Sequence, residues 1–181
     1  MINREIFYNN YHLKFGILSQ SQTEGLNFLL DKLDASEAFS LKTEYAYILA
    51  TIFHECASRW QPVTEMGSEH YLRSKRYYPF IGRGYVQLTW DFNYRKFGNL
   101  LGIDLEGSPA LALEPETAWQ ILETGMSKGM YTGRKLSDYV NENSTDYAGA
   151  RKVINGTDQQ YLVAGYAEKL ECGIVFDNSS C

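Results

Sequence analysis

Apolar residues recur at helical spacing along most of this chain. The strongest pattern lies in residues 43–57, where one stripe is formed by Tyr45, Ile48, Leu49, Ile52, Phe53 and Cys56. This spacing is typical of a helix with one buried face, so we expect the central helix of the fold here. Residues 21–33 also predict a helix, because Ser21 can cap the first turn, Glu24 follows three residues later, and leucines share one face.

Residues 59–90 interrupt this helical pattern. Proline and glycine are frequent there, and the run YVQLT at 85–89 alternates in polarity as a short strand does. We therefore expect a loop and a small β-hairpin. Helical periodicity returns in four later segments, at 93–101, 115–127, 146–154 and 158–170. The whole pattern predicts a mainly α-helical protein with one irregular excursion.

Length and composition fit a single domain covering residues 1–181. The chain is long enough to bury a continuous core, and its 44% apolar and 22% charged residues are near globular averages. No internal repeat or low-complexity linker divides it. We expect a monomer.

The formal net charge of -5 changes the expected partners. A general nucleic-acid binder would carry a basic stripe, so nucleic acid is excluded as the partner. The N-terminus lacks the apolar core of a secretory signal, and no stretch approaches a membrane span. We expect synthesis in the cytoplasm and no membrane insertion, so any action outside the cell would require release by another system.

Three cysteines leave an odd one over. Cys56 lies in the predicted central helix, facing the core, which argues against a nucleophilic role. A bridge between Cys172 and Cys181 is conceivable in an oxidising compartment, but we expect the reduced form.

Glu55 is the first candidate for chemistry. It lies at the edge of the apolar stripe and near the C-terminal end of the predicted helix, and both placements disfavour negative charge. A carboxylic acid that keeps its proton is what protonation of a glycosidic oxygen requires. Periodicity alone, however, favours an ordinary surface residue.

A second carboxylate would have to share a cleft with the first. Glu65 and Glu69 are the next acids, both in the irregular stretch. Ten residues of chain easily span the roughly 6.5 to 9.5 Å that separates an inverting pair. Reach alone leaves both acids open.

These residues belong to a larger set that resembles a known family. The set comprises His54-Glu55, Pro62, Glu65, Gly67, the run GRGYVQLTW at 82–90, and Asn93-Tyr94. It resembles glycoside hydrolase family 19, which contains chitinases and bacteriophage endolysins with lysozyme activity. The resemblance spans about residues 3 to 170, and the short spacing between the acids is similar to the compact phage branch. It implies a lysozyme-like helical domain with a small β-hairpin and a substrate cleft between two lobes.

The resemblance also implies residue roles. Glu55 matches the general acid, Glu65 matches the general base, and Thr89 matches a hydroxyl that helps hold the nucleophilic water. The residues that match the sugar cleft are Gln87, Asn93, Tyr94 and Asn155. Amides and hydroxyls of this kind can bind N-acetyl and hydroxyl groups without adding charge. For Asn155 a simple Asn-Gly turn is a strong alternative.

The implied reaction is inverting hydrolysis of β-1,4 bonds in bacterial peptidoglycan. Two departures matter: the plant-type insertion between the acids is missing, and Cys56 stands where Thr or Ser is frequent. Three alternatives stay open: a chitinase, an antibacterial toxin with an immunity partner, and a glycan-binding protein without turnover. His54-Glu55 does not begin a zinc motif, because position 58 is Ser. No metal or cofactor is expected.

Overall fold

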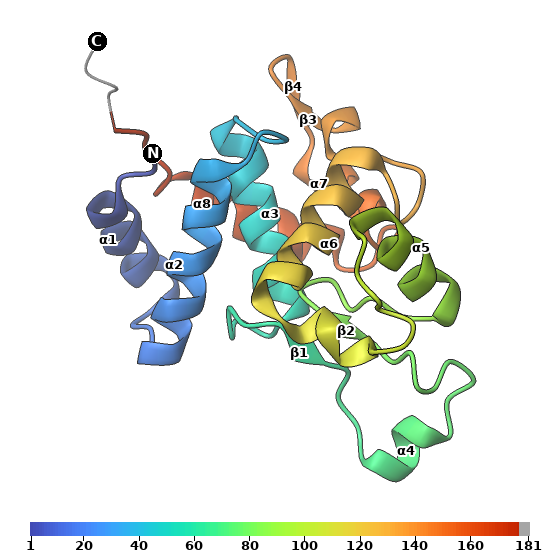
Figure 1. Cartoon of the computed structure of the whole chain (residues 1–181). Helices are drawn as coiled ribbons and strands as arrows, with labels where there is room; N and C mark the ends of the chain where they lie inside the picture. Colours follow the sequence, from blue (N-terminus) through green and yellow to red (C-terminus); the bar gives the residue numbers. More distant parts are fainter. Residues whose placement is uncertain (178–181) are drawn as a thin grey trace. The chain divides into compact units, whose positions relative to one another are not determined.

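The computed structural model describes residues 1–177, and this part of the chain is mainly helical (Figure 1). Its eight α-helices are α1 (Arg4–Phe15), α2 (Gln20–Ala35), α3 (Lys42–Glu55), α4 (Glu69–Arg73), α5 (Asp91–Leu101), α6 (Pro115–Lys128), α7 (Tyr147–Ala150) and α8 (Gln160–Glu171). Two short strand pairs, β1 (Val63–Thr64) with β2 (Arg83–Gly84) and β3 (Val140–Asn141) with β4 (Ser144–Thr145), complete the regular structure together with the 3-10 turns η1 (Pro109–Leu113), η2 (Leu136–Asp138) and η3 (Arg151–Val153). The mainly α fold is confirmed.

The chain forms two compact units. Unit 1 contains residues 1–60 and the chain from Thr124 onward, and unit 2 contains Gln61–Glu123. The assignment of 1–181 to a single domain stays a prediction. No helix in residues 1–177 is long and apolar enough to cross a membrane.

The helix α3 is the centre of unit 1, as its apolar stripe predicts. Every residue from Glu44 to Ile52 is buried, and α3 packs along α8. A helix that is buried on all sides belongs to the interior, and each fully buried Leu or Ile stabilises the fold by roughly 1.5 to 3 kcal/mol. The interior of unit 1 therefore holds α3 in one fixed position.

The N-terminal end of α2 differs from the sequence expectation. Ser19, and not Ser21, caps this helix: its hydroxyl accepts from the Gln22 backbone, and the Gln22 side chain accepts from the Ser19 backbone. Both serines offer a capping oxygen, and the reciprocal bond with Gln22 decides between them. The helix α1 has no counterpart in the expected elements, because only Phe7 and Tyr11 of its residues are buried.

Unit 2 replaces the expected strand at 85–89 with a tight turn, so that prediction is wrong. Arg83 and Leu88 exchange two backbone hydrogen bonds, and Gln87 between them has a φ of 55°. The antiparallel strand pair is formed instead by β1 and β2, with Val63 opposite Gly84, and the segment between these strands includes α4. Tyr85 and Val86 are both buried, so the alternation in polarity does not correspond to two faces of a strand.

The predicted helices after residue 90 are present with shifted ends. The segments 93–101 and 115–127 match α5 and α6, and 158–170 matches α8. The segment 146–154 divides into the single turns α7 and η3. The expected helix at 43–57 ends at Glu55, because Ala57 and Ser58 adopt left-handed φ values of 48° and 58°.

Candidate active site

Glu55 is the last residue of α3 in unit 1. Its side chain is 15% exposed, and the helix stops directly after it. The buried length of α3 on one side and the left-handed turn at Ala57 and Ser58 on the other therefore hold this carboxyl at a fixed edge of the core.

A buried arginine contacts this carboxyl. Arg151, with a side chain only 1% exposed, donates through Nη1 to Glu55 Oε1 at 2.5 Å. Its Nε donates to the Asp158 carbonyl at 2.8 Å, so the loop after η3 fixes the guanidinium. Arg151 was missed in the sequence analysis. One feature of the sequence points to it: Arg151 follows Tyr147 by four positions, so the two residues share one face of the predicted helix 146–154. In the structure both side chains are buried.

The ion pair changes the expected electrostatics of Glu55. A guanidinium at this distance stabilises the carboxylate, which opposes the effect of the helix end. Within residues 1–177, Oε1 is the carboxyl oxygen with a hydrogen-bond partner, and Oε2 has none. This leaves Oε2 as the oxygen that can carry a proton towards a ligand.

Glu65 follows β1 in unit 2 and is bound through both carboxylate oxygens. Oε1 accepts from the Tyr77 hydroxyl at 2.7 Å, and Oε2 accepts from the Gly82 backbone at 3.1 Å. The Glu65 backbone in turn donates to the Gly82 carbonyl at 2.7 Å. Two hydrogen-bond donors therefore fix the position of this half-buried carboxyl.

Tyr77 is a second residue missed in the sequence analysis. Its hydrogen bond to Glu65, followed by desolvation, raises the pKa of Tyr77 to about 12. The hydroxyl therefore keeps its proton and donates to Glu65 throughout the neutral range. One tyrosine among fourteen carries no signal in the sequence that marks this role.

The structure also separates the two candidate bases. Glu69 begins α4, its side chain is 77% exposed, and it pairs with Arg73 one turn later at 2.6 Å. Its environment is that of a solvated surface residue, whereas Glu65 is held by two donors. The geometry favours Glu65.

Three predicted residues lie in the turn that follows β2. The Gln87 amide donates to the Val63 carbonyl at 3.0 Å, the Thr89 hydroxyl donates to the Gln87 carbonyl at 2.8 Å, and the Asn93 amide donates to the Thr89 carbonyl at 2.9 Å. All three are half-buried, and a Cβ on Gly82 would contact both Gln87 and Glu65. The turn therefore brings Gln87 beside the predicted base.

Tyr94 and Asn155 occupy different surroundings. Tyr94 is fully buried, donates to the Ile81 carbonyl at 2.7 Å and accepts from Arg83 at 3.0 Å, which favours a structural role. Asn155 is exposed, and its backbone donates to the Arg151 carbonyl at 2.9 Å. The predicted sugar contacts of both residues stay predictions.

Strained backbone marks the same places. The residues of 1–177 other than glycine with positive φ are Ala57, Ser58, Trp60, Gln87, Trp90 and Gln159. Three of them follow Glu55, two flank Thr89, and one follows Asp158, the acceptor for Arg151. Such conformations cost roughly 1 to 3 kcal/mol each and cluster at functional sites. Their distribution supports the candidate residues of both units.

Cys56 is only 1% exposed, and burial raises the pKa of its thiol to about 12. We expect a brief treatment of the native protein with iodoacetamide at pH 8 to leave the peptide containing Cys56 unlabelled, because the reactive thiolate is scarce and inaccessible. Mass spectrometry of the digest checks this, and the same peptide should be labelled in denaturant. Labelling of Cys56 in the native state would contradict it. Cys172 is exposed, whereas its conceivable partner Cys181 lies outside the described residues.

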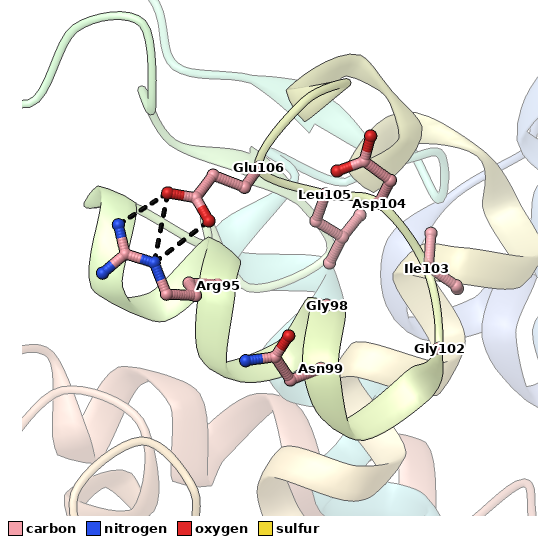
Figure 2. Close-up of a pocket in the computed structure, with 8 residues that line it drawn as sticks. All are labelled: Arg95, Gly98, Asn99, Gly102, Ile103, Asp104, Leu105 and Glu106. Atoms are coloured by element: carbon pink, nitrogen blue, oxygen red, sulfur yellow. Dashed lines mark hydrogen bonds and ion pairs between the residues drawn. The ribbon is translucent and has the colours of Figure 1, made fainter.

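A pocket of unit 2 lies away from these residues. Figure 2 shows it between α5 and the loop that follows. Its volume is about 300 Å³. Arg95 on its rim is bound by Glu106 at 2.6 Å, so the two charges cancel. No group of three or more metal-ligating side chains occurs in residues 1–177.

Comparisons with known proteins agree with this fold. No family model matches the chain. An endochitinase from Arabidopsis thaliana is 33% identical over 94 residues, which are 48% of this chain and 33% of the relative. The chain thus spans about a third of that relative's length.

Solved structures match over nearly the whole chain. Chitinase C from Streptomyces griseus matches with a TM-score of 0.65 at 20% identity, covering 96% of this chain and 79% of that chain. A bacterial family 19 chitinase matches with a TM-score of 0.58 at 20% identity, covering 99% and 98%. The chain has the fold of these family 19 chitinase structures, as the resemblance implied.

Proposed function

We propose that this chain is an endo-acting glycoside hydrolase that cleaves β-1,4 bonds of bacterial peptidoglycan with inversion. The observation that carries the proposal is the contrast between the two carboxyls. Glu55 lies against a buried cation with one oxygen left for a proton, whereas both oxygens of Glu65 accept hydrogen bonds. The free Oε2 of Glu55 can deliver a proton, and Arg151 would stabilise the carboxylate left behind, whereas Glu65 is held by two donors in the place of a base.

In the proposed reaction, Glu55 protonates the leaving glycosidic oxygen through Oε2. Glu65 accepts a proton from water as the water attacks the anomeric carbon, and the Thr89 hydroxyl helps hold that water. Arg151 orients Glu55 and stabilises the carboxylate that remains after the proton leaves. Tyr77 orients Glu65 by its hydrogen bond. Gln87 and Asn93 supply amides near the sugar.

Chitin is the second candidate substrate, because the matched proteins are named as chitinases. Product analysis decides between the two. The purified protein is incubated with peptidoglycan sacculi and separately with chitin oligosaccharides, and new reducing ends are identified by mass spectrometry. Muropeptides ending in N-acetylmuramic acid would support the peptidoglycan proposal. Cleavage of chitin alone would replace it with a chitinase, and no product from either would favour a glycan-binding protein.

The biological setting is also a proposal. We expect synthesis in the cytoplasm and action on the wall after release by another system, as for a phage lysis enzyme. A toxin delivered into a competitor has the same chemistry and would need an immunity protein in the producing cell. Co-purification of an inhibitory partner from that cell would favour the toxin.

Tyr77→Phe should lower kcat by about tenfold, because a hydrogen bond to a charged acceptor contributes roughly 1.5 to 3 kcal/mol and its loss frees one oxygen of Glu65. Initial rates on the cleaved substrate measure the effect, with circular dichroism to verify folding. Tyr161→Phe is the matched control, since Tyr161 lies in α8 and its side chain is exposed. An unchanged kcat in Tyr77→Phe would remove Tyr77 from this positioning role.

A further inference from the structure

Residues 69–83, here called the basic segment, differ in charge from the rest of the chain. They contain four of the 17 Lys and Arg residues but one of the 22 Asp and Glu residues. The chain as a whole has a net charge of -5, so positive charge is concentrated in this part of unit 2. Figure 1 shows α4 within it, on a loop that extends from the β1–β2 pair.

The cations of this segment differ in whether a group of the protein already binds them. Arg73 is bound by Glu69, and Arg83 is half-buried and donates to Tyr94 and to backbone carbonyls. No carboxylate in residues 1–177 pairs with Lys75 or Arg76. These two adjacent charges are therefore available to an anion from outside the chain.

Exposed aromatic rings accompany these cations. Lys75 Nζ lies 3.8 Å from the centroid of the Tyr71 ring, and Arg73 lies 5.6 Å from that of Tyr78. Both rings are more than 40% exposed. Exposed rings and amphipathic cations on one surface suit a ligand with sugar faces and negative groups.

The basic segment also leads directly to the candidate base. Tyr77 follows Arg76 and donates to Glu65, and its ring packs edge-on against Trp90 at 5.2 Å. Trp90 in turn stacks on Phe92 at 6.2 Å, and both are exposed. A glycan that reaches Glu65 would thus meet this surface within the same unit.

We infer that the basic segment, through Lys75 and Arg76, binds the stem-peptide carboxylates of peptidoglycan and so selects this polymer over uncharged chitin. The inference rests on the proposed glycan hydrolysis and adds the interaction that distinguishes peptidoglycan from chitin. Chitin carries N-acetyl groups without charge, whereas a peptidoglycan strand carries carboxylates on its stem peptides. Lys75 and Arg76 can form ionic contacts with the carboxylates of peptidoglycan. Chitin has no charged group with which they could form such a contact.

Co-sedimentation of the full chain with sacculi free of teichoic acid tests this inference without requiring turnover. The double variant Lys75→Gln/Arg76→Gln should bind about five- to tenfold more weakly at low salt, because two ionic contacts of modest strength, one at a half-buried and one at an exposed side chain, are lost. At roughly 0.5 M salt the difference should disappear through screening. Binding to colloidal chitin should change less than twofold.

The matched control is Lys14→Gln/Lys128→Gln, which removes two exposed charges from unit 1. It should bind sacculi as the native protein does. Sacculi whose carboxylates have been amidated with carbodiimide and ethanolamine provide the neutral ligand, and the native chain should bind them as weakly as the double variant binds untreated sacculi. Thermal melts verify that both variants are folded.

Several outcomes would overturn the inference. Equal losses in both double variants would indicate a general charge effect, and unchanged binding in Lys75→Gln/Arg76→Gln would exclude the segment. Loss of binding to phosphatidylglycerol vesicles with unchanged binding to sacculi would assign the segment to a membrane surface. An active Glu55→Gln would defeat the proposed hydrolysis while leaving the sedimentation result intact, so the two failures are distinguishable.

Discussion

Glu55→Gln should lower kcat by about 10³-fold, because the amide cannot donate the proton that the leaving oxygen needs, and general acid catalysis contributes roughly 10² to 10⁴-fold. The amide oxygen can still accept from Arg151, so the variant should fold. Product release from the cleaved polymer measures the loss, and circular dichroism verifies the fold.

Two further variants sharpen this test. Glu65→Gln should also lose activity, whereas Glu69→Gln should retain it, because Glu69 is a solvated residue paired with Arg73. An active Glu65→Gln together with an inactive Glu69→Gln would show that Glu69, and not Glu65, is the base. Substantial activity in Glu55→Gln would remove that residue from the proton-donor role altogether.

Arg151→Met should lower the free energy of unfolding by about 3 kcal/mol, because removal of one partner leaves the Glu55 carboxylate largely buried without its cation. Methionine fills much of the same volume, so the loss reports on charge more than on a cavity. Urea denaturation at pH 7 measures it. Lys152→Met is the control: its side chain is exposed, and a change within about 0.5 kcal/mol is expected.

The double variant Glu55→Gln/Arg151→Met completes a thermodynamic cycle. With neither charge present, the penalty of an unpaired carboxylate disappears, so the double variant should be more stable than the sum of the single changes predicts. A coupling energy near zero would mean that the short contact between Arg151 and Glu55 contributes nothing to stability.

Local pattern was sufficient for the longer helices. The apolar stripe of α3 and the apolar positions of α5, α6 and α8 are buried in the structure. The spacing of apolar residues in the sequence therefore predicted these helices correctly. The helix α1 was not predicted because its few buried residues leave little periodicity. The run at 85–89 has the composition of a strand but forms a turn, since backbone bonds between Arg83 and Leu88 close it.

The residues of the candidate site also divide into those that the sequence predicts and those that it does not. Glu55 and Glu65 could be proposed from helix geometry and resemblance, because both depend on nearby sequence. Arg151 could not, because its contact with Glu55 joins residues 96 positions apart. Tyr77 is only 12 positions from Glu65, but an irregular loop brings them together, and no periodicity predicts such a path.

The left-handed residues after Glu55 also decide where the protein can be made more heat-resistant. A glycine at position 57 or 58, in place of Ala57 or Ser58, would remove the steric cost of the left-handed backbone. It would also stabilise the unfolded state by about 0.4 to 1 kcal/mol, because glycine gives the unfolded chain more conformations. The net gain in the free energy of unfolding would therefore be small. The residues present restrict the backbone at the end of α3, which glycine would release. Engineering for durability therefore belongs on surface positions of α1 and α2, where exposed side chains can be replaced without loosening this turn.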